Sequence, residues 1–287
     1  MSSSAAPLEI AREVLRELQS QRPDEVVIDV AGVNAGPTPE PAPPHPLARG
    51  WILCSAAAAM YDWWVPIRTA AEAGGSGPKV LATYDPATDP LPISDFSVFG
   101  SIPRMMVGAP ADGPSCRAAV ADAAARLGPV YLRLPSPAAP TVSNGTFGFG
   151  RAPVLRSGND LTVVGVGGAL PLALALADRL VGVGVSVRVL DGASVKPLDA
   201  PALVRAARET GAILTVEEHH ALTGYGAGAA VLTAGSHPVM VRRVGLPDLP
   251  IAPGAQRPPA AAAAYGLSLE RLEEEAWGLL RAKGKVQ

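Results

Sequence analysis

Cysteine is scarce in this 287-residue chain, which contains only Cys54 and Cys116 and no CxxC spacing. Two distant cysteines do not make a disulfide framework, so we expect reduced thiols that pack as small apolar residues in a cytoplasmic protein. Long hydrophobic runs are also missing, because no apolar stretch approaches the roughly 18 residues of a membrane-spanning helix. The N-terminal segment becomes charged and amphipathic at Glu9 and Arg12, which predicts that it is not a secretory signal.

The chain also lacks an excess of either positive or negative charge, since 24 Lys and Arg residues and 26 Asp and Glu residues give a net charge of -2. The basic residues are scattered rather than clustered, which argues against a nucleic-acid partner. What the chain does have is apolar content, at 48% of its residues. A chain of this length and composition is sufficient for the cores of two compact domains.

Helical and strand patterns alternate in the first half of the chain. Residues 8–20 carry apolar side chains at helical spacing and lead into a β-branched run over 25–30. Six prolines between residues 31 and 46 remove backbone donors and predict a loop. The other expected elements are a strand entering a helix over 51–59, a helix at 60–72, a strand at 79–83, a helix at 118–127 and a strand at 130–134.

The alternation is more regular in the second half, beyond a stretch rich in Pro, Ser, Asn and Gly. We expect a first domain at 1–140, a linker at 141–160 and a second domain at 161–287. Repeated strand and helix units predict an α/β fold of two three-layer α/β/α domains with mostly parallel sheets. The elements expected in the second domain are strands at 161–166, 186–190, 212–216 and 239–244, and helices at 169–181, 200–210, 228–233 and 268–282.

Several segments resemble the transketolases and related thiamine diphosphate enzymes. The stretch GAILTVEEHHALTGYGAGAAVLTAGSHPVMVRRVGLPDLP (211–250) looks like part of their last domain, and FGFGRAPVLRSGNDLTVVGVGGALPLALALADRL (147–180) is similar to the segment that enters it. Upstream, SIPRMMVGAPAD (101–112) and LGPVYLRLPSP (127–137) look like parts of the pyrimidine-binding domain. The chain therefore resembles a separately encoded C-terminal half with a shortened pyrimidine-binding domain.

This resemblance implies a partner polypeptide, because the family binds its cofactor between a pyrimidine-binding and a pyrophosphate-binding domain. We expect an N-terminal, pyrophosphate-binding transketolase subunit to hold most of the thiamine diphosphate and the Mg²⁺ in a hetero-oligomer. The implied reaction transfers a two-carbon ketol unit between sugar phosphates or modified aldehydes. This chain alone is expected to be inactive and to bind the cofactor weakly.

In the family, a carboxylic acid hydrogen-bonds the pyrimidine ring and so promotes formation of the thiazolium ylid. Here the proline loop replaces the helix that carries that acid, and Glu40 is its sole acidic residue. Glu40 is the candidate catalytic acid, and a surface carboxylate is the alternative. Ala57 and Met60 occupy the positions of cofactor-facing aromatic residues, although ordinary helix packing also explains both.

Two residues at strand ends align with substrate-binding positions of the family. Tyr84 stands where a histidine approaches the donor substrate, and the alternative is a structural tyrosine at the end of a strand. Arg133 stands where an arginine binds the phosphate of a sugar phosphate, a task that suits a planar guanidinium. A solvated arginine at a strand terminus is the other interpretation of Arg133.

Two further patterns are explained by structure rather than by ligand binding. The Gly165-x-Gly167 pattern lacks the third glycine of a dinucleotide-binding fingerprint, and it therefore predicts a structural turn. The run Glu217 to His220 contains metal-capable groups, but neighbours on an extended chain point to opposite sides, so we expect no metal site. Two functions stay open: a subunit of a two-component transketolase-like enzyme, or a noncatalytic structural or regulatory subunit of a thiamine diphosphate enzyme complex.

Overall fold

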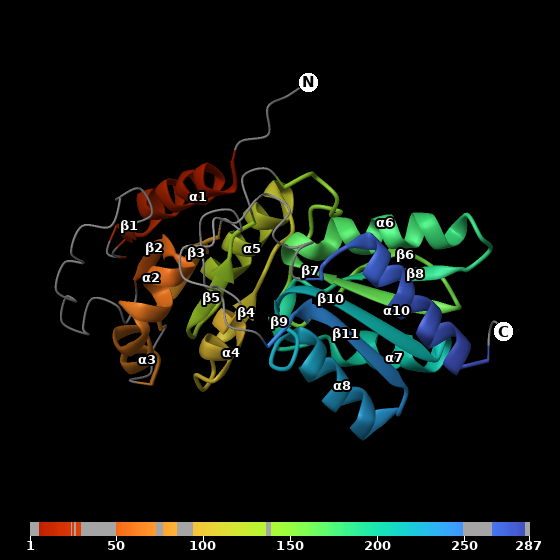
Figure 1. The fold of residues 1–287 in the computed structure, drawn as a ribbon. Coiled ribbons are helices and arrows are strands. Elements are labelled where there is room, and N and C mark those ends of the chain that lie inside the picture. The colour runs from red at the N-terminus through yellow and green to blue at the C-terminus, as the bar shows by residue number, and fades with distance from the viewer. Residues whose placement is uncertain are drawn as a thin grey trace.

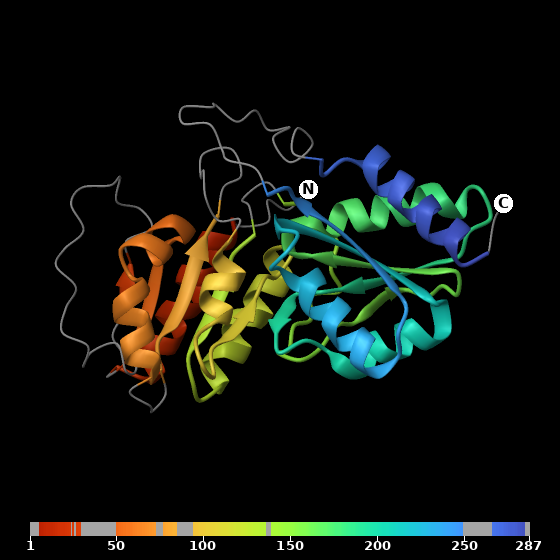
Figure 2. The same cartoon turned by 60° about the horizontal axis from the view of Figure 1, so that its bottom comes forward.

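The computed structural model describes residues 6–23, 25, 27–29, 50–72, 77–84, 94–135, 139–248 and 266–284. Within these residues, helices and strands alternate along the chain and form two sheets that lie side by side (Figures 1 and 2). Both sheets are mostly parallel and have helices packed on both faces. The predicted α/β class with two layered units is therefore confirmed.

The first sheet has the strand order β1-β2-β3-β5-β4-β9. All neighbouring pairs are parallel except β4 with β9, which is antiparallel. In the centre of the sheet, Leu53 of β2 lies opposite Leu81 of β3, which in turn lies opposite Leu132 of β5. The strands are β1 (Val27–Asp29), β2 (Trp51–Ser55), β3 (Lys79–Thr83), β4 (Met106–Gly108), β5 (Val130–Arg133) and β9 (Ser194–Lys196).

The second sheet has the order β11-β10-β7-β8-β6, with only β6 antiparallel to its neighbour. Leu161 to Val166 of β7 are buried throughout, as expected for a central strand covered on both faces. The strands are β6 (Val154–Arg156), β7 (Leu161–Val166), β8 (Val187–Asp191), β10 (Ala212–His220) and β11 (Met240–Leu246).

The helices cover the sheets in layers. Helices α1 and α5 pack on one face of the first sheet, and α6 and α10 pack on one face of the second. The helices are α1 (Pro7–Gln21), α2 (Ala56–Tyr61), α3 (Trp64–Glu72), α4 (Asp95–Gly100), α5 (Gly113–Ala125), α6 (Leu170–Val181), α7 (Ala200–Thr210), α8 (Tyr225–Ser236) and α10 (Leu269–Ala282). None of the described helices has both the length and the apolar character needed to cross a membrane.

Strand β2 shows how the sequence divides the core, because its side chains alternate between the two faces of the sheet. Trp51 and Leu53 join the cluster beneath α1 and α5, whereas Ile52 and Cys54 join the cluster on the opposite face. That second cluster continues into the second sheet, where it includes Val164. The two cysteines are both buried and unpaired, and burial raises the pKa of each thiol to about 12.

Strand β9 joins the two halves of the chain, since it comes from the second half but pairs with β4 of the first sheet. Its Lys196 ammonium donates hydrogen bonds to the carbonyls of Gly100 and Ile102, each at 2.8 Å. Strand β6, by contrast, lies within the expected linker and pairs with the second sheet. The division into domains at 1–140 and 161–287 stays a prediction.

Asp112 attaches the segment after the first sheet to helix α5. Its carboxylate accepts hydrogen bonds from the backbone N–H of Ser115 at 3.0 Å, Val142 at 2.9 Å and Ser143 at 2.7 Å. With the Ser115 hydroxyl accepting in turn from the Asp112 backbone, the start of α5 forms a capping box. Burial acts to raise the pKa of Asp112, but these hydrogen bonds outweigh it and hold the pKa below its usual value.

Periodicity did not predict the short elements α4, β6 and β9. Each has three to six residues, too few to establish a helical or strand period. Strand β10 runs on to His220, four positions beyond the predicted Val216, with an irregular register against β11 over that extension. Helix α10 begins after the N-cap Ser268, whose hydroxyl accepts from the backbone N–H of Arg271.

Candidate functional site

The candidate site lies where the carboxyl ends of the two sheets approach each other. A cavity of about 130 Å³ is lined by Tyr84 after β3, Arg133 at the end of β5, Gly167 and Gly168 after β7, and Glu218 of β10. Strands β7 and β10 are neighbours in the second sheet. From β7 the chain continues to β8 on one side of this pair, and from β10 it continues to β11 on the other side. Such a switch point is where ligands bind in open parallel sheets.

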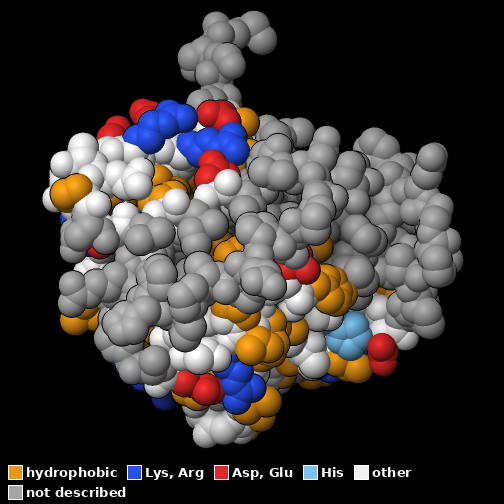
Figure 3. Space-filling model, turned by 90° about the vertical axis from the view of Figure 1, so that its left-hand side faces the viewer, with side chains coloured by type: hydrophobic (Ala, Val, Ile, Leu, Met, Phe, Trp, Pro, Cys, Tyr) orange, Lys and Arg blue, Asp and Glu red, His pale blue; other side chains and the backbone are white. Residues whose placement is uncertain are grey.

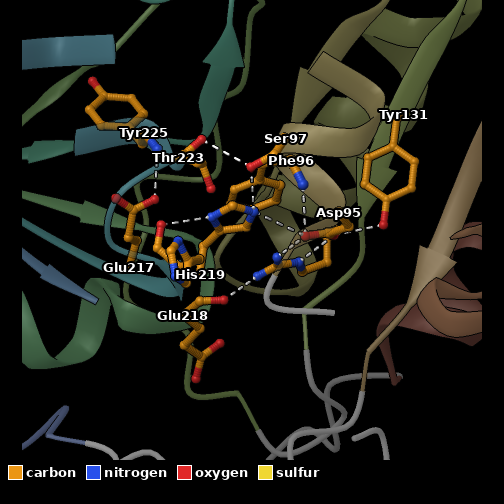
Figure 4. Close-up of polar contacts among 11 residues, drawn as sticks. Asp95, Phe96, Ser97, Tyr131, Glu217, Glu218, His219, Thr223 and Tyr225 are labelled. Carbon is orange, nitrogen blue, oxygen red and sulfur yellow. Dashed lines mark hydrogen bonds and ion pairs between the residues drawn. The ribbon is translucent and has the colours of Figure 1, made fainter. Parts of the chain in front are cut away.

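Asp95 is the buried anion of this site (Figure 4). Its carboxylate accepts hydrogen bonds from the Tyr131 hydroxyl at 2.7 Å and from Arg133 Nε at 2.8 Å. A second bond from Arg133 Nη2 makes the ion pair bidentate, and the backbone N–H of Phe96 donates as well. Burial, followed by the negative charge of Asp95, raises the pKa of Tyr131 well above its usual value, so its hydroxyl is a permanent donor.

Arg133 is held on several sides at once. Its guanidinium carbon lies 3.8 Å from the centroid of the Phe96 ring and 5.2 Å from that of Tyr84. Nη1 donates a hydrogen bond to the Glu218 carbonyl at 2.9 Å, which connects β5 to β10. Burial acts to lower the pKa of Arg133, but the Asp95 carboxylate outweighs it and raises the pKa. The side chain is therefore a fixed cation beside the cavity.

The His219 ring lies against the ring of Phe96 (Figure 4). The two rings are stacked, with centroids 4.8 Å apart and planes 5° apart. Burial lowers the pKa of His219 to about 4 despite the nearby Asp95, so the ring is neutral at neutral pH. Its Nδ1 lies 3.2 Å from the His220 carbonyl, which favours a proton on Nδ1 and leaves Nε2 facing the Ser97 hydroxyl at 3.5 Å.

The neighbouring glutamates have different surroundings. The Glu217 carboxylate accepts from the backbone N–H of Tyr225 at 2.7 Å and Gly226 at 2.9 Å, at the start of α8. Burial raises the pKa of Glu217 to about 7 and also raises that of Glu218. Glu218 faces the cavity, and its carboxylate lies so close to Gly168 that a Cβ atom there would collide with it.

The structure brings together two of the residues singled out in the sequence, Tyr84 and Arg133. Ala57 and Met60 lie on α2 and do not line the cavity; both are partly buried, and Met60 packs against the core. Glu40 lies outside the described residues. The proposed roles of these residues in catalysis, cofactor binding and phosphate binding stay predictions. Among the described residues, no group of three His, Cys, Asp or Glu side chains is arranged to hold a metal ion.

Sequence reasoning missed Asp95, the partner of Arg133. Nothing in the local sequence marks it, because it belongs to the short helix α4 and lies 38 positions before Arg133. The available signal was Arg133 itself, an arginine inside the apolar run VYLRLP (130–135). A charge in a buried strand needs a partner of opposite sign. The arginine in this apolar run therefore predicts an acidic partner elsewhere in the chain.

Comparison with known proteins places the second half of the chain in a family. Residues 150–272 match the family described as "Transketolase, C-terminal domain". This part of the chain is a transketolase C-terminal domain. It contains β7, β10 and Glu218, and it therefore supplies one wall of the cavity, while Tyr84 and Arg133 come from the preceding part of the chain.

Two curated relatives are subunits of transketolases. The chain is 37% identical over 176 residues to the 6-deoxy-6-sulfo-D-fructose transketolase subunit SqwH of Clostridium sp. (strain MSTE9). The aligned residues make up 61% of this chain and 54% of the relative. It is 38% identical over 159 residues to an apulose-4-phosphate transketolase subunit of Phocaeicola vulgatus, covering 54% of this chain and 51% of the relative. The chain thus spans about half the length of these curated relatives.

A solved structure matches almost the whole chain. The structure titled "Split gene transketolase, inactive beta4 tetramer" superimposes with a TM-score of 0.84 at 29% identity, over 97% of this chain and 99% of that one. The similarity to this split gene transketolase chain therefore covers both sheets and not only the C-terminal domain.

Proposed function

We propose that this chain is the C-terminal subunit of a two-component transketolase-type enzyme. The observation that carries the proposal is the end-to-end similarity to a split gene transketolase chain, together with two relatives that are named as transketolase subunits. The enzyme would transfer a two-carbon ketol unit between sugar phosphates or modified aldehydes. It would assemble from this chain and an N-terminal, pyrophosphate-binding subunit in the cytoplasm.

Thiamine diphosphate and Mg²⁺ would be held mainly by the partner subunit. Helix α2 has the sequence AAAAMY, so it offers Ala57 and Met60 as apolar surface but neither a carboxylic acid nor an aromatic ring at those positions. Helix α2 therefore does not supply the acid that the pyrimidine ring requires, and Glu40 lies outside the described residues. We assign to this chain no chemical step that passes through the cofactor.

Within this proposal, the Arg133 cavity binds the phosphate of the substrate. Asp95 and Phe96 hold the guanidinium in place before substrate arrives, which lowers the cost of ordering it on binding. Tyr84, at the same cavity, is positioned to donate a hydrogen bond to the substrate. Glu218 lines the cavity too, and a protonated carboxyl there would avoid repelling a phosphate.

The partner would cover apolar surface on α2 and α3. Tyr61 and Val65 are 65% and 68% exposed there. The face that carries these helices shows hydrophobic side chains next to charged ones (Figure 3). Stable subunit interfaces bury such apolar residues at their centre.

The alternative is a noncatalytic structural or regulatory subunit of a thiamine diphosphate enzyme complex. The hydrogen bonds that Arg133 donates to Asp95 and to the Glu218 carbonyl favour this alternative. Through these bonds the arginine links the two sheets structurally. Under this alternative, another chain would supply the working pyrimidine-binding domain. An additional intact pyrimidine-domain gene beside this one would favour it, whereas a single pyrophosphate-domain gene would favour the catalytic subunit.

The deciding experiment is co-purification with the product of the neighbouring gene, followed by a ketol-transfer assay. We expect a stable complex that is active with thiamine diphosphate and Mg²⁺, and no activity from this chain alone. A complex that forms but becomes active only after a third, pyrimidine-domain protein is added would support the noncatalytic role. A stable monomer that ignores the neighbouring protein would count against both forms of the proposal.

A further inference from the structure

The Glu218 side chain is a part of the Arg133 cavity that the fold leaves unused. Its backbone carbonyl accepts a hydrogen bond from Arg133 Nη1 at 2.9 Å. Its carboxylate makes no hydrogen bond or ion pair with any other residue that the structure describes (Figure 4). The neighbouring Glu217 differs, because its two oxygens accept from the backbone N–H of Tyr225 and Gly226. Glu217 therefore has a structural role, whereas the Glu218 carboxylate is available to a ligand.

Gly168 provides the space that the Glu218 carboxylate occupies. Successive side chains of a strand point to opposite sides, so Glu217 reaches the start of α8 while Glu218 reaches the turn before α6. A Cβ atom at residue 168 would lie 2.4 Å from Oε2 of Glu218 and 3.0 Å from its Cδ. Gly167 and Gly168 of this turn line the same cavity as Glu218. The carboxylate therefore lies at the cavity wall.

A partly buried carboxylate without hydrogen bonds is an unfavourable arrangement until a donor reaches it. Burial raises the pKa of Glu218, while the charge of Arg133 acts in the opposite direction. The Arg133 guanidinium is bound to Asp95 and to the Glu218 carbonyl rather than to this carboxylate. Whether protonated or ionised, a carboxyl group keeps an oxygen that accepts a hydrogen bond. A donor supplied by a ligand would replace the water that burial removes.

A hydroxyl group is the donor that fits this position. An ammonium group or a metal cation would be repelled by the fixed charge of Arg133, which lines the same cavity. A hydroxyl donates without adding charge. The cavity of about 130 Å³ has room for a small fragment. A phosphate toward Arg133 and a hydroxyl toward Glu218 are the two features of a sugar phosphate.

We propose that Glu218 determines specificity by accepting a hydrogen bond from a hydroxyl group of the substrate whose phosphate lies at Arg133. This inference rests on the proposed function and names a second contact in the same cavity. Analogues that lack the hydroxyl would be rejected, because they leave the carboxylate without a donor. Glu218 thus selects hydroxylated phosphates, while Arg133 selects the phosphate itself.

The test compares glycerol 3-phosphate with propyl phosphate, which has the same phosphate and carbon chain but no hydroxyl groups. Isothermal titration calorimetry on the full chain measures both affinities, without the partner and without turnover. We expect glycerol 3-phosphate to bind about tenfold more tightly, the worth of one hydrogen bond to a charged group. Glu218→Ala should reduce this preference to less than about twofold and leave the affinity for propyl phosphate unchanged.

Two further variants make the result independent of any loss of folding in Glu218→Ala. Glu218→Gln retains a carbonyl acceptor and should keep part of the preference. Gly168→Ala leaves the carboxylate in the chain but displaces it from its position, so the preference should fall although residue 218 is unchanged. The control is Glu274→Ala, which removes an exposed glutamate of α10 that does not line the cavity and should preserve the full preference.

Equal affinity of the wild-type chain for the two phosphates would overturn the proposal, and so would a preference that survives in Glu218→Ala. Absence of saturable binding would overturn it too. A complex that performs ketol transfer while the chain shows no preference would retain the proposed function and reject this inference. The converse result, a clear preference in a chain that forms no active complex, would retain the hydroxyl contact and reject the proposed function.

Discussion

Arg133 and Asp95 form a bidentate ion pair at the junction of the two sheets, with side chains that are 6% and 0% exposed. The pair connects β5 to helix α4, and through the Glu218 carbonyl it also connects the first sheet to the second. A charge buried so deeply is stabilised only while its partner is present.

Replacing Asp95 with Asn should strongly destabilise the chain, because it keeps the shape but leaves the Arg133 charge buried without its counterion. Loss of one partner of a buried pair costs about 3–5 kcal/mol. Urea denaturation at neutral pH measures this free energy of unfolding. The control is Asp178→Asn, which removes a partner from the exposed Arg156 pair and should cost less than about 1 kcal/mol. Equal effects of the two variants would contradict a buried, solvent-free ion pair.

Replacing Arg133 in the assembled enzyme should discriminate between substrates. If Arg133 binds phosphate, Arg133→Lys should raise KM for phosphorylated aldehydes about tenfold to a hundredfold, the worth of a charged hydrogen bond. Lysine keeps the charge but not the bidentate geometry. Unphosphorylated aldehydes are the internal comparison, and their KM should change little. A uniform loss for both substrate classes would indicate that Arg133 acts only through the structure.

Asp112 should make stability depend on pH. Its folded pKa is lower than the unfolded value of about 3.9, so its contribution is present above that value and is lost as pH falls through the folded pKa. Asp112→Asn should cost about 1–3 kcal/mol at pH 7, because the amide nitrogen that replaces Oδ2 cannot accept the bonds from the backbone N–H of Val142 and Ser143. Urea midpoints at pH 7, 5 and 3 should converge at the lowest pH. A constant difference across this range would rule out the ionised carboxylate as the cause.

Gly165 lets helix α6 pack closely on strand β7. A Gly165→Ala variant places a methyl group against the Leu170 backbone and the Ala173 side chain, and overpacking of this kind costs about 1–3 kcal/mol. Gly235→Ala in α8 is the matched control, because the added Cβ meets no atom within 4 Å. Alanine in place of a helical glycine should stabilise by about 0.5–1 kcal/mol. Thermal unfolding should therefore move in opposite directions for the two variants, and the same direction for both would contradict the crowding at Gly165.

The regular elements could be predicted because each has its own local signal. The runs KVLAT and APALVRAARET were delimited correctly as β3 and α7, since one is a short buried β-rich run and the other has apolar residues at helical spacing after an acidic cap. Helix α4 gave no such signal, because a helix of six residues shows less than two full turns of periodicity.

The site itself required tertiary information. Tyr84 and Arg133 were identified through their family positions, yet the ion pair with Asp95 joins residues far apart in sequence and depends on which strands become neighbours. The stacking of His219 on Phe96 likewise joins the two sheets across more than a hundred positions. Periodicity describes one segment at a time, so contacts between distant segments lie beyond it.

Strand β9 determines how the chain can be divided. A cut within 141–160 would remove from the first sheet its last strand, which comes from beyond the cut, and would leave the edge of β4 unpaired. The other fragment would carry that strand without its sheet, together with a Lys196 side chain that has lost its acceptors at Gly100 and Ile102. The two fragments would then be complementary and would reassemble by strand addition, which makes the chain suited to a split-protein format in which each part is incomplete without the other.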